Sequence, residues 1–210
     1  MNKAPMALSY EELINTFEST WEQVGLHEHD IIEYITPATL ERTFRVQLFP
    51  DHGEPLTNAN MPPWVEATVV WGPAHHLYHG GLTSQSPLEI QWNYTIPLPL
   101  GEKRPDQEIV KAAHTLIRQV VRRLFNEDVG HDVLAIEIRR AFAVDGRSVS
   151  ALQLYASGTS DITEVLLTSG GEALQTVLRE ECSMVAALVL AFGETFNPGS
   201  VGGYRAVESA

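Results

Sequence analysis

The hydrophobic positions near the start of the chain repeat at helical spacing. Ser9 and Glu12 have the spacing of a capping box, in which two residues satisfy each other's free backbone amides at the first turn of a helix. The apolar residues that follow on one face are Leu13, Ile14, Phe17, Trp21 and Val24. This pattern predicts an amphipathic helix that ends at Gly25.

Four segments after this helix have the pattern of strands: residues 31–35, 43–49, 65–71 and 88–96. The last alternates most regularly, with one apolar face made of Leu88, Ile90, Trp92, Tyr94 and Ile96. Such alternation predicts a sheet that has one face against a core. In an up-and-down meander of these strands, successive loops would lie at alternate ends of the sheet.

A second helix is predicted to begin after Pro105, with Asp106 as its cap, and to end near Phe125. Its apolar stripe consists of Ile109, Ala113, Leu116, Ile117, Val120, Val121 and Leu124. This stripe predicts a helix that packs one face against the sheet.

The dipeptide Asp145-Gly146 lies between two further alternating segments. Asp-Gly is typical of the two-residue turn of a β-hairpin, because both residues tolerate positive φ. The hairpin predicts two opposing pairs, Phe142 with Val149 and Arg140 with Ala151.

The last third of the chain is predicted to be mainly helical. A short helix is expected from Asp161 to Thr168, then a break at Gly170-Gly171 and a long helix that ends near Phe192. Residues 184–192 are apolar on every side of that helix, so we expect other elements or a second subunit to enclose them. Residues 197–210 are predicted to be a flexible tail after a single domain of residues 1–196.

These elements together predict the α+β class, with a mostly antiparallel sheet of about six strands packed against two or three long helices. The chain has 210 residues, of which 44% are hydrophobic, and this is enough to bury a substantial core.

The formal net charge of −13 changes the functional picture. So acidic a chain is not expected to bind nucleic acid or an anionic membrane, and its longest apolar run, nine residues, is too short to cross a bilayer. With a single cysteine and no basic-then-apolar stretch at its start, the protein is expected in the cytoplasm.

Two groups of histidines are candidate ligand sites. His27, His29 and Glu33 have a spacing that resembles the first metal-binding motif of cupins, although Leu40 stands where cupins carry a glycine. With His52 they would offer one divalent transition metal a ligand set; the alternative is an ordinary polar turn. A second candidate is the loop of residues 72–87, where His75, His76, Tyr78 and His79 could bind a ligand or simply be solvated.

The positive charge of the chain is concentrated in one region. Nine of the 14 basic residues lie between residues 103 and 147. Five of them could contact an anion or an acidic partner, or form salt bridges with acidic neighbours: Arg118, Arg122, Arg123, Arg139 and Arg140.

No nucleophile motif or nucleotide-binding loop is present in the sequence. We therefore expect a non-catalytic binding or assembly protein without a cofactor, which self-associates and meets a protein partner through its acidic surface. Two alternatives stay open. One is a metal-dependent enzyme or sensor that uses the histidine site, and the other is a carrier of a small apolar ligand.

Overall fold

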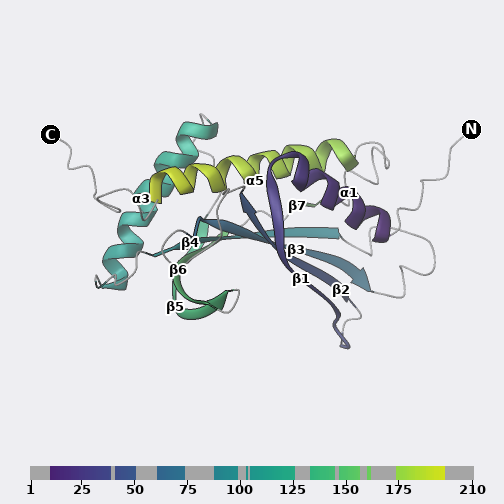
Figure 1. Ribbon diagram of the computed structural model, residues 1–210, viewed down its shortest axis with the longest axis horizontal. Helices are drawn as coiled ribbons and strands as arrows, with labels where there is room; N and C mark the ends of the chain where they lie inside the picture. Colours follow the sequence, from purple (N-terminus) through teal and green to yellow (C-terminus); the bar gives the residue numbers. More distant parts are fainter. Residues whose placement is uncertain are drawn as a thin grey trace, which may run out of the picture. The chain divides into compact units, whose positions relative to one another are not determined.

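The computed structural model describes residues 10–38, 41–50, 61–73, 88–98, 103, 105–125, 133–144, 147–156, 160–161 and 174–196 (Figure 1). The helices of this part of the chain are α1 (Tyr10–Gln23), α3 (Asp106–Phe125) and α5 (Leu174–Phe196). Its strands are β1 (Leu26–Ile35), β2 (Glu41–Pro50), β3 (Trp64–Pro73), β4 (Leu88–Pro97), β5 (Val133–Val144), β6 (Arg147–Ala156) and β7 (Ser160–Asp161).

Six strands follow one another in the order β1-β2-β3-β4-β6-β5, and the short β7 pairs with β4. The predicted α+β class with a mostly antiparallel sheet is confirmed. Contacts within the chain define two compact units, the first made of residues 1–48, 66–92 and 158–186 and the second of residues 49–65, 93–157 and 187–210. The single domain of residues 1–196 stays a prediction, and the tail lies outside the described residues.

In the first unit, α1 buries the apolar face that the sequence predicts. The ring of Phe17 lies 4.7 Å from that of Trp21 and 5.8 Å from that of Trp92 on β4, measured between centroids. Trp21 also stacks on Phe44 of β2 at 6.2 Å. These aromatic contacts fix α1 against one face of the strands of its own unit.

The connection from α1 to β1 is shorter than the sequence predicts. Gly25 has a φ of +78°, a conformation open to glycine, and its N–H donates to the carbonyl of Glu22 at 3.1 Å. Leu26 follows at once as a fully buried strand residue. The first strand therefore begins at Leu26 and not at Ile31, because a single left-handed residue suffices to turn the chain.

In the second unit, α3 begins at Asp106, as predicted, but Asp106 is not its cap. The carbonyl of Pro105 accepts the N–H groups of Glu108 and Ile109, so Pro105 holds the capping position. The Asp106 carboxylate instead accepts a hydrogen bond from Arg140 on β5 at 2.6 Å. The helix buries Ile109, Ala113, Ile117 and Val120.

The hairpin of β5 and β6 has the predicted register next to its turn, where Phe142 pairs with Val149. The second predicted pair is wrong by one residue, because Ala151 lies opposite Arg139 and not Arg140. A register shift between Arg139 and Phe142 places one additional residue in β5, as in a β-bulge. The turn residues Asp145 and Gly146 lie outside the described part.

The last third of the chain differs from its prediction at two points. Asp161, predicted to begin a short helix, instead lies in β7 and pairs with Glu89 of β4. The remainder of the predicted helix lies outside the described residues. Helix α5 ends at Phe196, four residues beyond the predicted end, because Phe196 is buried and its ring lies 6.1 Å from that of Phe192.

A separate apolar cluster belongs to the second unit. Phe49 of β2 stacks on Trp64 of β3 with ring centroids 5.2 Å apart, and both side chains are buried with Met61, Val149 and Ala151. Adjacent residues of a strand point to opposite faces of the sheet. Leu48 and Phe49 are both buried, and so are Trp64 and Val65, so β2 and β3 bury residues on both faces here.

Candidate functional site

Strand β1 is exposed along almost its whole length. Of its ten residues only Leu26 is buried. Four large apolar side chains on it are 39–49% exposed to solvent, and we call them the apolar edge: Ile31, Ile32, Tyr34 and Ile35. Because β1 is the first strand in the sheet order, its neighbour among the described strands is β2 alone.

The apolar edge presents side chains on both faces of β1. Asp30 and Ile32 border a shallow hollow with Arg45 of β2 and Glu66 of β3, and these last two form an ion pair at 3.3 Å. Glu33 lies on the opposite face, where its Oε1 is 2.5 Å from Nε of Arg42 on β2. Adjacent apolar residues such as Ile31 and Ile32 must therefore point to opposite sides of the strand.

The Glu33 carboxylate belongs to a small charged network that includes α1. The Arg42 guanidinium lies 3.6 Å from the centroid of the Tyr10 ring, which is a cation–π contact. Burial raises the pKa of the Tyr10 hydroxyl above its usual range, the Glu33 carboxylate raises it further, and Arg42 lowers it. This network ties β1 and β2 to the first helix on one face of the strands.

Exposed acidic side chains lie on β1 itself and on the helix before it. Glu11, Glu22, Glu28 and Asp30 are exposed on α1 and β1. Partial burial raises the pKa of Glu18 on α1, and the neighbouring carboxylates Glu28 and Glu22 raise it as well. The surface formed by α1 and β1 is thus both acidic and apolar.

The predicted metal site falls on this strand in part. His27, His29 and Glu33 are exposed on β1, and Glu33 is already bonded to Arg42. His52 lies outside the described residues. Among the described residues, no group of three or more His, Cys, Asp or Glu is placed to hold a metal ion. The metal site as a whole stays a prediction. The predicted ligand loop with His75, His76, Tyr78 and His79 also lies outside the described part.

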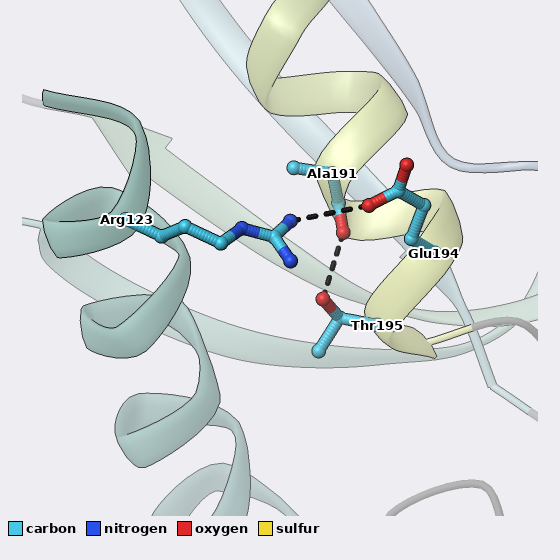
Figure 2. Close-up of polar contacts among 4 residues, drawn as sticks. All are labelled: Arg123, Ala191, Glu194 and Thr195. Atoms are coloured by element: carbon cyan, nitrogen blue, oxygen red, sulfur yellow. Dashed lines mark hydrogen bonds and ion pairs between the residues drawn. The ribbon is translucent and has the colours of Figure 1, made fainter.

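The five arginines of the basic region do not gather at one point. Arg123 of α3 pairs with Glu194 of α5 at 3.2 Å, as Figure 2 shows, and Thr195 on the same helix donates to the carbonyl of Ala191 at 2.8 Å. Arg140 pairs with Asp106. Arg118, exposed on α3, borders a shallow groove with Lys111 and His114. Arg123 and Arg140 thus form salt bridges of the kind that one alternative predicted. Arg122 and Arg139 are exposed on α3 and β5.

Cys182 lies on α5 in the first unit and is fully buried. Burial, together with a smaller effect of the Glu181 carboxylate, raises the pKa of its thiol to about 12. A protonated, enclosed thiol is a poor nucleophile, so this cysteine acts as a small core residue.

Most of the apolar run 184–192 of α5 is enclosed by this chain itself. Val185, Ala186, Leu188 and Val189 are at most 7% exposed, and Leu190 is 54% exposed. Enclosure by other elements, one of the two expectations from the sequence, accounts for the run except for Leu190, which is exposed, and Met184 and Ala187, which are half-buried. No helix within the described ranges is long and apolar enough to cross a membrane.

Sequence reasoning missed the apolar edge. The signal was present in residues 31–35, where two adjacent isoleucines interrupt strict alternation and a third closes the strand. An end strand with apolar residues on both faces leaves some of them exposed on each. No family model, curated protein or solved structure matches this chain in the comparisons made with each.

Proposed function

We propose that this protein is a non-catalytic binding protein of the cytoplasm that self-associates and offers an acidic surface to a protein partner. The observation that carries the proposal is the apolar edge of β1. Fully burying an Ile or Tyr side chain stabilises by about 1.5 to 3 kcal/mol, so covering the exposed part of four such side chains would contribute about 3 to 5 kcal/mol. Edge strands of monomers are often very short, whereas β1 is ten residues long.

The acidic side chains of α1 and β1 support the second part of the proposal. Protein interfaces commonly combine apolar with polar residues, and two of these acidic residues, Glu28 and Asp30, lie on the same strand as the apolar edge. A basic protein surface would approach them faster than a neutral one, because charge complementarity raises association rates.

The mass of the protein in solution tests self-association. At about 10 µM, light scattering and native mass spectrometry should give a multiple of the 23.3 kDa chain. The Ile32→Lys variant should lower that mass, and Leu190→Lys, a matched change at a still more exposed apolar residue of α5, should not. A wild-type mass of one chain would contradict self-association, and an effect of Leu190→Lys alone would move it to α5.

Two further measurements test the remaining parts. A lysine-rich peptide, used as the probe, should bind wild-type protein at low salt and bind a Glu22→Lys, Glu28→Lys double variant several-fold more weakly. Equal binding would contradict the acidic surface. Elemental analysis that finds one equivalent of metal per chain, lost in a His27→Ala, His29→Ala double variant, would instead favour the metal-dependent alternative.

A further inference from the structure

We propose that the outer edge of β1 pairs with β1 of a second copy of this chain, antiparallel, with the two-fold axis at Ile31 or Ile32. The inference rests on the proposed self-association and names its geometry. Two copies of β1 would then become neighbouring strands, and the sheet of one copy would continue into that of the other.

The backbone of β1 shows which of its groups are available for pairing. The N–H of Thr36, just after the strand, donates to the carbonyl of Glu41 on β2 at 2.8 Å. In an antiparallel pair, alternate residues direct both backbone groups to the same neighbour. The backbone N–H and C=O groups of Tyr34 and Ile32 therefore point toward β2. Those of Ile31, Glu33 and Ile35 point away from it. An incoming strand requires such a regular row of donors and acceptors.

The charges on β1 limit the registers in which a second copy of this strand can pair with it. A two-fold axis at Asp30 would place two aspartates directly opposite each other, and an axis at Glu33 would do the same with two glutamates; both are destabilising. An axis at Ile31 places His29 opposite the partner's Glu33. An axis at Ile32 places Asp30 opposite the partner's Tyr34. Each of these two registers places a pair of isoleucines together on the axis and opposes no like charges.

The other end strand of the sheet order has different chemistry. The exposed residues of β5 include Glu137, Arg139 and Arg140, which are charged, as in strand edges that resist pairing. β1 carries charged residues as well, Glu28, Asp30 and Glu33, but it adds the four exposed side chains of the apolar edge. Among the residues whose side chains are described, β5 has no exposed large apolar side chain, so the apolar edge favours β1 as the strand that pairs.

Disulfide trapping tests the pairing directly. Cysteine is introduced in the separate variants Ile31→Cys, Ile32→Cys and Ile35→Cys, at about 150 mM salt so that repulsion between the acidic chains is screened. The native Cys182 is buried and does not compete. At least one of the first two variants should form a covalent dimer under mild oxidation, because residues on the axis have Cα atoms about 4.5 to 5.5 Å apart.

The Ile35→Cys variant is the matched control, since Ile35 is as exposed as Ile31. In the proposed registers it lies roughly 20 to 26 Å along the strand from the partner's Ile35, which is too far for a disulfide. Equal trapping at all three positions, or trapping at residue 35 alone, would overturn the pairing.

A proline variant separates this pairing from self-association in general. Ile31→Pro removes an outward N–H without touching the bonds to β2, and Ile31→Thr keeps that N–H. If β1 strands pair, Ile31→Pro should raise the dimer dissociation constant at least roughly tenfold above that of Ile31→Thr. Circular dichroism confirms that both variants are folded. An oligomeric wild type whose mass is unchanged by Ile31→Pro would overturn the pairing and leave self-association standing, whereas a monomeric wild type would overturn both.

Discussion

Two leucines of the last helix lie two residues apart and have opposite environments, so together they give a quantitative test of the structure. Leu188 is 7% exposed and Leu190 is 54% exposed. Leu188→Ala removes buried methyl groups and leaves a cavity, which costs about 2 to 4 kcal/mol of unfolding free energy. Leu190→Ala removes surface that is half in water already, and alanine favours helix, so its cost should stay below about 1 kcal/mol.

Urea denaturation followed by tryptophan fluorescence measures both variants. For a urea dependence of about 2 to 3 kcal/mol per molar, Leu188→Ala should lower the unfolding midpoint by about 1 M, and Leu190→Ala by no more than about 0.4 M. The experiment is done below 1 µM, where association contributes least to stability. Equal midpoint shifts would refute the reasoning, because they would mean that Leu190 is as enclosed as Leu188.

Three further predictions rest on single residues. Gly25→Ala should lower the unfolding free energy by about 1 to 2 kcal/mol through the positive φ alone, because no atom lies within 4 Å of the added Cβ. Gly25→Asn should cost less, since asparagine tolerates this conformation better, and equal urea midpoints for the two variants would contradict the prediction. The thiol of Cys182 should react with a thiol reagent at pH 8 only after unfolding, and fast labelling of the folded protein would argue against its burial. Because the pKa of the thiol is raised in the folded state, the free energy of unfolding should fall as the pH rises above the ordinary thiol pKa of about 9. Glu194→Gln should change the unfolding free energy by less than about 0.5 kcal/mol, because both partners of its ion pair with Arg123 are more than half exposed, and a loss above 1 kcal/mol would show a stronger role.

The amphipathic elements could be predicted from the sequence because their burial follows a regular period. The stripe of α3 at Ile109, Ala113 and Ile117 is buried as expected, and so is the alternating face of β4 at Ile90, Trp92 and Tyr94. The Asp-Gly dipeptide gave the register near the hairpin turn for the same reason, since local turn geometry fixes which residues oppose each other.

The features that escaped prediction depend on tertiary context. The bulge beyond Arg139 adds one residue without any local composition signal, so the pair at Ala151 could not be assigned. The ion pair of Arg123 with Glu194 joins residues 71 positions apart, and no pattern along the chain relates them. The exposure of Ile31 and Ile35 follows from the place of β1 at the end of the strand order, which depends on every other strand.

The two compact units have a consequence for how the protein is made. Each unit takes three separate stretches of the chain, and both need part of α5, which ends at residue 196 of 210. When the first 150 residues have been synthesised, neither unit is therefore complete. The strands made by then still lack α5. No N-terminal part of the chain that stops before α5 contains a whole unit. Nascent strands with apolar faces would depend on chaperones during synthesis, and truncation anywhere before α5 should yield aggregates in place of a smaller folded protein.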